Sequence, residues 1–102
     1  MFKHIVMWKL MNEAFGKSKE ANANEMKRIL ETLPENIDEI RGYEVGINIG
    51  NSAAAFDIVL ISAFDSVDDF NTYQEHPEHQ KVVDFIRQIQ SEAKVVDYKT
   101  ED

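Results

Sequence analysis

The sequence has no cysteine, only two prolines and four glycines, and no apolar run longer than four residues. Without cysteine there can be no disulfide framework, zinc–thiolate site or thiol nucleophile. The longest apolar runs fall far below the ~20 residues that a membrane-spanning helix needs. Basic residues are also scarce, at 11 against 19 acidic ones, which gives a net charge of −8. An acidic surface repels nucleic acid and anionic membranes, so neither is predicted as a partner.

What is present suits a folded protein. The 102 residues are 43% hydrophobic and 29% charged, which fits a single domain over residues 1–102 and is too apolar for a disordered chain. The first ten residues lack the long apolar stretch and small-residue cleavage site of a secretory signal. We therefore predict a soluble, cytoplasmic protein.

The apolar pattern predicts strands over residues 2–10, 42–49, 55–64 and 94–100, separated by helical segments. Alternation of apolar and polar residues is typical of strands, and the 3.6-residue period is typical of helices. The order β-α-β-β-α-β is that of ferredoxin-like folds. The predicted fold class is therefore α+β, with a four-stranded antiparallel sheet and helices on one face.

Residues at the helix ends support these boundaries. Ser18 is placed to cap a helix that runs to about Leu33, and Pro34 then ends it. Ser66 begins a short helix, which breaks at His76 because proline disfavours a helical residue before it. Pro77 suits the first position of the next helix.

Both faces of the predicted sheet are apolar. Ile5 and Met7 point to one face of the first strand, whereas Val6 and Trp8 point to the other. Helices can cover only one face, which leaves roughly 440 Å² uncovered on four strands spaced ~4.8 Å apart. Soluble monomers seldom expose a larger patch. A homodimer formed by sheet-to-sheet packing is the predicted cover; loops or the C-terminal tail are the alternative.

Five side chains carry candidate chemistry. His4 lies in the first strand, and Tyr73, His76 and His79 surround the predicted helix break. His79 falls in the first turn of the last helix, whose dipole disfavours a protonated ring. A neutral imidazole there can act as a general base, with Tyr73 donating to a carbonyl. Asp97, in the last strand, can orient a histidine through a charge-assisted hydrogen bond.

Each of these residues also has a structural interpretation. His4 can be a hydrogen-bonded core histidine, His76 a helix cap, His79 a surface residue and Tyr73 core filling. Asp57, at the start of the third strand, is predicted to face water. His76 and His79 have a spacing that suits metal ligands, but no acidic cluster completes a site, so no metal is predicted.

The residues resemble the stress-responsive A/B barrel (Dabb) domain family over nearly the whole chain. The resemblance rests on the opening Lys3-His4-Ile5-Val6, on Tyr73-Gln74-Glu75-His76-Pro77-Glu78-His79, and on Val96-Asp97-Tyr98. It implies a ferredoxin-like subunit whose sheet packs on that of a second copy to form a homodimeric α+β barrel. Many such proteins have no assigned role, and a plant branch acts as cofactor-independent polyketide cyclases.

The resemblance also implies roles for individual residues. His79 would remove a proton next to a carbonyl, Tyr73 would hydrogen-bond the enolate oxygen, and Asp97 would hold His79 in its useful tautomer. Neither a cofactor nor a metal is implied. The predicted ligand-binding residues, for a small apolar or carbonyl-containing ligand, are His4, Val6, Trp8, Val59 and His76.

Three classes of function remain open at this point. The first is a homodimer that binds a small molecule without turning it over. The second is a cofactor-independent enzyme of the aldol-type cyclase or monooxygenase-like kind that uses Tyr73 and His79. The third is an interaction module with no ligand. A cavity at Tyr73 and His79 would favour the first two classes over the third.

Overall fold

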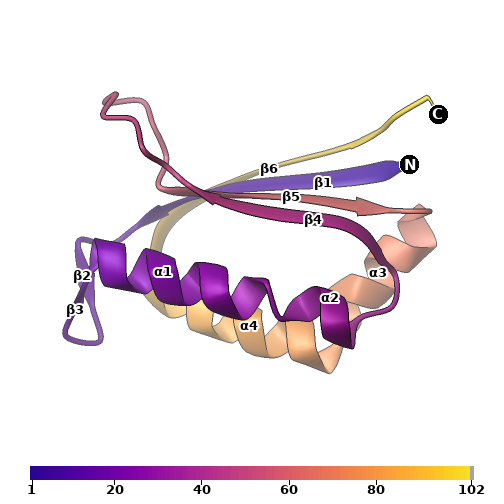
Figure 1. Cartoon of the computed structure of the whole chain (residues 1–102), viewed down its shortest axis with the longest axis horizontal. Coiled ribbons are helices and arrows are strands. Elements are labelled where there is room, and N and C mark those ends of the chain that lie inside the picture. Colours follow the sequence, from indigo (N-terminus) through magenta and orange to yellow (C-terminus); the bar gives the residue numbers. More distant parts are fainter. Residues whose placement is uncertain (102) are drawn as a thin grey trace.

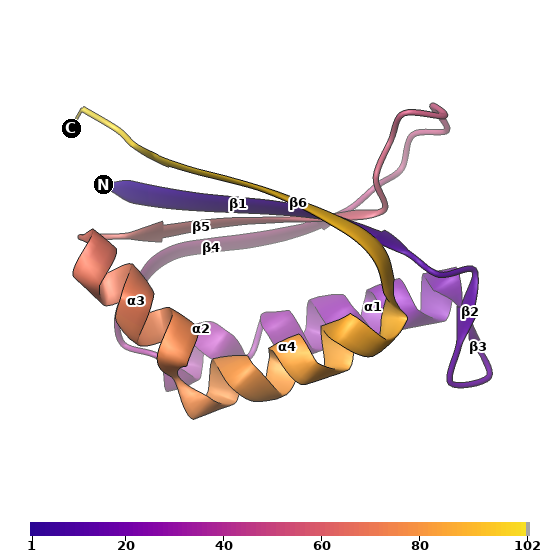
Figure 2. The same ribbon diagram turned by 180° about the vertical axis from the view of Figure 1, so that it is seen from behind.

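The computed structural model describes residues 1–101 and shows one four-stranded antiparallel sheet with helices on a single face (Figures 1 and 2). The sheet order is β4-β5-β1-β6. Its strands are β1 (Phe2–Leu10), β4 (Ile40–Ile47), β5 (Ile58–Phe64) and β6 (Gln90–Lys99). The helices are α1 (Lys19–Leu30), α2 (Leu33–Asn36), α3 (Val67–Glu75) and α4 (Pro77–Ile89). The predicted α+β, ferredoxin-like arrangement is confirmed. Asp102, which the predicted domain includes, lies outside the described residues.

Capping side chains set the helix starts, as predicted. The Ser18 hydroxyl accepts a hydrogen bond from the backbone of α1, and Ser66 does the same for α3. Each bond satisfies one of the backbone N–H groups that the first helical turn leaves free. His76 has an extended backbone that separates α3 from α4, and Pro77 is the first residue of α4.

The first helix is shorter than predicted. It ends at Leu30, and Leu33 and Pro34 begin the separate short helix α2. A proline ring collides with the carbonyl group four residues before it, which here belongs to Leu30. The helix therefore ends at that carbonyl and not at the residue before the proline.

The strand ends differ from the predicted ones. β4 begins at Ile40, β5 begins only at Ile58, and β6 follows α4 directly. Residues 48–57 instead form a loop that projects beyond the sheet (Figure 1). Within the loop, the Asn48 side chain bonds to both backbone groups of Gly50.

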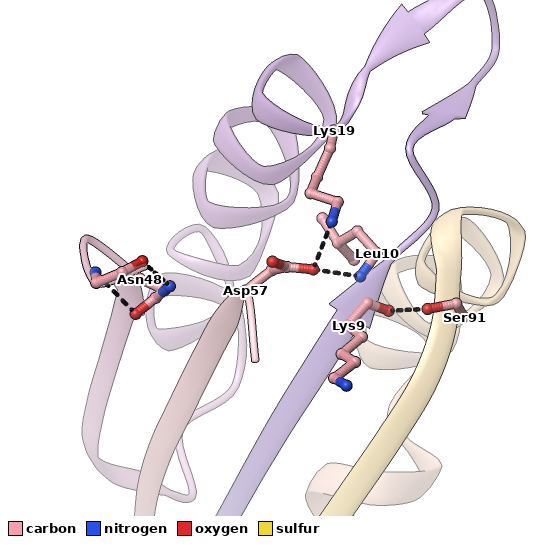
Figure 3. A network of polar contacts seen from close by, with 7 residues as sticks. Lys9, Leu10, Lys19, Asn48, Asp57 and Ser91 are labelled. Atoms are coloured by element: carbon pink, nitrogen blue, oxygen red, sulfur yellow. Dashed lines mark hydrogen bonds and ion pairs between the residues drawn. The ribbon is translucent and has the colours of Figure 1, made fainter. Parts of the chain in front are cut away.

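Asp57 closes the base of this loop, and the prediction that it faces water is wrong. Its carboxylate accepts a 2.8 Å hydrogen bond from the Leu10 backbone N–H and lies 3.5 Å from the Lys19 ammonium group (Figure 3). Asp57 thus ties the start of β5 to the end of β1 and to α1. Beside it, the Ser91 hydroxyl donates to the Lys9 carbonyl and fixes the start of β6 (Figure 3).

A small hairpin between β1 and α1 was not predicted. It consists of β2 (Glu13–Ala14) and β3 (Lys17–Ser18), joined by Phe15 and Gly16. Both connecting residues have positive φ, at 57° and 69°, which is the pattern of a type I′ turn. Such turns favour Asn-Gly, and a phenylalanine in this conformation is unusual.

The two faces of the sheet have different neighbours. The face toward the helices carries buried side chains of the core, with α1 packed on β4 and β1 and α3 packed on β4 and β5. The opposite face, here called the open face, has no helix on it (Figures 1 and 2). Its apolar side chains are Ile5, Met7, Val59, Ile61, Ala63, Val96 and Tyr98. The predicted two-faced strands are therefore present.

Candidate functional site

Four polar residues form a row across the helix-facing side of the sheet. The register pairs Tyr43 with Ser62, Ser62 with His4, and His4 with Asp97. Each of the four strands contributes one member. His4 and Ser62 are buried, so the row runs through the packed layer between sheet and helices. Buried polar groups need partners, and each one in this row has a partner.

His4 and Asp97 form the most polar contact of the row. Nδ1 of His4 lies 2.5 Å from a carboxylate oxygen of Asp97. This charge-assisted hydrogen bond fixes the orientation of the imidazole ring. The ring also packs on Phe70 of α3, with the ring centroids 4.7 Å apart. The Ser62 hydroxyl donates to the His4 carbonyl oxygen and holds the strand beneath the ring.

The other end of the row reaches α3 through two tyrosines. The hydroxyl groups of Tyr43 and Tyr73 lie 2.8 Å apart, and Tyr73 is completely buried. Burial raises the pKa of Tyr73 to about 12, although its hydrogen bond with Tyr43 opposes this effect. Burial, together with the neighbouring Tyr73, also raises the pKa of Tyr43. Both phenols therefore stay protonated near neutral pH and can donate hydrogen bonds.

His79 lies against Tyr73, with ring centroids 4.3 Å apart. Its Nδ1 is 3.2 Å from the Gln74 carbonyl oxygen. A carbonyl oxygen only accepts, so Nδ1 carries the proton and Nε2 keeps its lone pair. Burial lowers the pKa of His79, as do the nearby His4 and His76, while the bond to Gln74 acts in the opposite direction. Burial is the largest cause of this lowered pKa, and it favours the neutral imidazole predicted for His79.

We expect His79 to make the protein less stable in mild acid. The pKa of His79 is lower in the folded state than its ordinary value, so the unfolded chain binds the proton more readily. Its contribution is complete above about pH 6.5 and is lost as the pH falls below that value, at about 1.4 kcal/mol per unit of pKa lowering. Urea unfolding between about pH 7.5 and 5 should show a flatter pH dependence for His79→Gln than for the wild type. Equal slopes would contradict this interpretation.

The structure brings only some of the predicted site residues together. Tyr73 and His79 are in contact, and His4, Val6 and Trp8 share the helix-facing side of the sheet. Asp97, however, bonds to His4 and not to His79, so the predicted pairing is wrong.

Two predicted ligand-binding residues lie apart from this group. Val59 belongs to the open face, because its neighbours Ile58 and Leu60 point into the core. Nδ1 of His76 accepts a hydrogen bond from the Glu78 backbone, as the cap of α4. The structural interpretation of His76 as a helix cap is thus confirmed.

Tyr43 and Ser62 were not among the predicted site residues. The apolar–polar alternation of residues 42–49 indicates a strand but gives no role to the Tyr43 hydroxyl group. Ser62 stands between apolar neighbours in β5 and is fully buried. A lone small polar residue on the core side of a strand was the one available signal.

The row is closely packed, and solvent reaches it at the Asp97 end. The Asp97 side chain is 39% exposed, and Val95, on the same side of β6, is 58% exposed. β6 is an edge strand that the helices do not cover. A molecule that approaches from this edge therefore meets the His4–Asp97 pair first, whereas the Tyr43–Tyr73 pair lies at the opposite end of the row. Among residues 1–101, no cluster of three or more His, Asp or Glu side chains has the geometry of a metal site.

The four-stranded antiparallel sheet with helices on one face makes this a ferredoxin-like α+β protein. The family model of the Stress responsive A/B Barrel Domain matches residues 2–100. The chain belongs to this family, as the motifs around His4, His79 and Asp97 predicted.

Individual relatives agree with this assignment. A dimeric protein of unknown function with a ferredoxin-like fold from Bacteroides fragilis is 35% identical, with a TM-score of 0.85 over 97% of this chain and 95% of that one. An uncharacterised Streptomyces coelicolor protein is 32% identical over 87% of this chain and 90% of its own. Hydroxynitrile lyase from Passiflora edulis is 19% identical, with a TM-score of 0.82 over 99% and 94% of the two chains, and shares the fold.

No helix within residues 1–101 has both the length and the apolar character needed to cross a membrane.

Proposed function

We propose that the protein is a homodimer that binds a small carbonyl-containing molecule at the His4–Tyr73–His79 end of the core. One observation carries this proposal: ionisable side chains gather in the core, where apolar side chains would be sufficient for folding. Burying such groups costs free energy even when they are paired. Groups of this kind with shifted pKa values are typical of binding and catalytic sites.

The homodimer half of the proposal rests on the open face. Several of its apolar side chains are more than one-third exposed, among them Met7, Val96 and Tyr98. A second copy packed against this face would bury them by a two-fold symmetric contact. The description of the similar Bacteroides fragilis protein as dimeric supports a dimer.

The ligand class follows from the donors and acceptors at the site. The hydroxyl groups of Tyr43 and Tyr73 share one hydrogen bond, so one of their two protons remains to be donated to a carbonyl oxygen. The Nε2 lone pair of His79 can accept a hydrogen bond or a proton. A compact ketone with an apolar body matches these groups and the aromatic rings of Phe70 and Phe64 around them.

Turnover is the second candidate function, and the neutral His79 beside Tyr73 favours it. In this reaction, His79 Nε2 takes a proton from the carbon next to the carbonyl group, while the Tyr73 hydroxyl group stabilises the enolate oxygen. The proton then returns to the carbon or exchanges with water. The His4–Asp97 pair would position the row without touching the reacting atoms.

One probe, acetophenone, tests both functions. Binding is followed by two-dimensional amide NMR, and turnover by loss of the methyl proton signal of the probe in deuterium oxide. We expect shifts at β1, β6 and α3, and about tenfold weaker binding for Tyr73→Phe, equivalent to about 1.4 kcal/mol for the lost hydrogen bond. Tyr98→Phe is the matched control, since Tyr98 lies on the open face, and should bind normally.

The outcomes separate the candidates. Binding without exchange supports a binding protein, whereas exchange that His79→Gln abolishes supports an enzyme. If millimolar acetophenone shifts only open-face residues, or nothing, the site does not bind carbonyl compounds and the interaction module becomes the better interpretation.

A further inference from the structure

A hollow lies away from the His–Tyr row, between the two long helices. It encloses about 670 Å³ and is lined by α1, α4 and the β2–β3 hairpin. Its apolar walls come from Ile29 of α1, from Leu33 of α2, and from Val82 and Phe85 of α4. Both views of the fold place the hairpin at one end of these helices (Figures 1 and 2). This α1–α4 groove has the size of a site for one small molecule.

Phe15 covers the hairpin end of the groove, and its backbone conformation there is an unfavourable one. It occupies a left-handed conformation (φ 57°), and its side chain is 58% exposed. Its ring lies within 7° of parallel to that of Phe85, with centroids 6.1 Å apart. Asparagine or glycine would fit the turn without strain. A strained, exposed aromatic ring at the mouth of a groove is explained if the ring contacts a ligand.

The charges around the groove favour an anion. Arg28 pairs with Glu25, and Lys81 pairs with Glu78. Lys17 lines the groove and, among residues 1–101, has no ion-pair partner. The groove therefore offers one unneutralised positive charge on a protein whose net charge is −8.

The hairpin that carries this charge is held in place. The amide group of Asn22, a residue that is only 2% exposed, donates to the Ala14 carbonyl oxygen and joins α1 to β2. Phe15 and Lys17 follow directly in the chain, so the aromatic ring and the ammonium group are both presented by an anchored turn.

We propose that the α1–α4 groove binds an aromatic carboxylate, with the ring against Phe15 and Phe85 and the carboxylate beside Lys17. The ion pairs along both helices confine the apolar surface to the groove itself, which suits a small molecule better than a broad protein contact. This site is separate from the His4–Tyr73–His79 site and does not depend on the function proposed there.

Naphthoate and its neutral analogue naphthamide test the proposal, with binding measured by calorimetry and by amide NMR on the intact protein. We expect naphthoate to shift residues of the hairpin, α1 and α4. Lys17→Gln should weaken naphthoate binding about three- to fivefold, as for a partly exposed charge pair, and leave naphthamide unchanged. Lys99→Gln, which removes an exposed lysine outside the groove, is the control.

Substitution at Phe15 tests the aromatic wall. Phe15→Asn introduces a residue that tolerates the left-handed turn and should weaken the binding of both probes about tenfold. Phe15→Tyr should bind both probes normally. Tyr73→Phe should have no effect on either probe. The proposal would be overturned if Phe15→Asn and Lys17→Gln both left the affinity for naphthoate unchanged, or if the amide NMR shifts were centred on the His–Tyr row. A rise in mass with concentration that Phe15→Asn abolishes would also overturn it, because the groove would then hold a second copy of the chain.

Discussion

Replacing Ile61 by lysine should convert the proposed dimer into monomers. Ile61 lies near the middle of the open face, opposite Ile5 on one side and Glu44 on the other. It is 37% exposed in the single chain, so a lysine there can reach water and the neighbouring carboxylate. In a dimer, two ammonium groups would be removed from water, each at a cost of several kcal/mol. The dissociation constant should rise at least about 100-fold, since each tenfold step is 1.4 kcal/mol.

Sedimentation velocity over a range of concentrations measures this change, and thermal unfolding of dilute protein checks that the monomer still folds. Val67→Lys is the matched control, because Val67 is 43% exposed but lies at the start of α3, on the helical side. It should leave the dimer intact. If Ile61→Lys remains as dimeric as Val67→Lys, the open face is not the dimer interface and loops or the tail must account for its cover.

Replacing Phe64 by alanine should remove a large part of the folding free energy. Phe64 is completely buried at the end of β5, and its ring packs on Phe70 and Tyr73 at centroid distances of 5.4 and 5.0 Å. Such a truncation costs about 3–5 kcal/mol, against a total of about 5–15 kcal/mol for a typical domain. Urea unfolding followed by circular dichroism measures the loss.

Phe64→Leu provides the graded comparison. It keeps most of the apolar volume and should cost clearly less than Phe64→Ala, because the cavity that remains is smaller. An alanine variant that is unfolded without urea agrees with the prediction, provided that the leucine variant folds. A loss below about 1 kcal/mol for alanine would mean that the α3–β5 contact is not a main part of the core.

The parts of the fold that were predicted correctly are those with local causes. Ser18 and Ser66 begin helices, and His76 and Pro77 divide two helices, because capping and proline geometry depend on a few adjacent residues. The hairpin at Phe15 was missed because its turn lacks the asparagine that such turns favour. The start of β6 was missed because Gln90 and its polar neighbours become a strand only by pairing with β1.

The same distinction holds for the site: the contact with a local cause was predicted, and the contacts that depend on strand pairing were not. Tyr73 and His79 stand six positions apart around one helix break, so their contact follows from local geometry. The partner of Asp97 depends on the register between β1 and β6, which joins residues 93 positions apart. Alternation within a strand gives the face on which a residue lies but not its neighbour on the next strand. Tyr43 and Ser62 could be recognised as members of the row only once that register was known.

The strand order also governs when the sheet can form during synthesis. β1 is the first strand made, yet it lies between β5 and β6, and β4 pairs with β5. A nascent chain that ends before Ile58 therefore contains none of the strand pairs of the four-stranded sheet. β1 therefore has no partner strand of the sheet until β5 has been made. The polar row, which needs all four strands, is completed last, when Asp97 arrives beside His4.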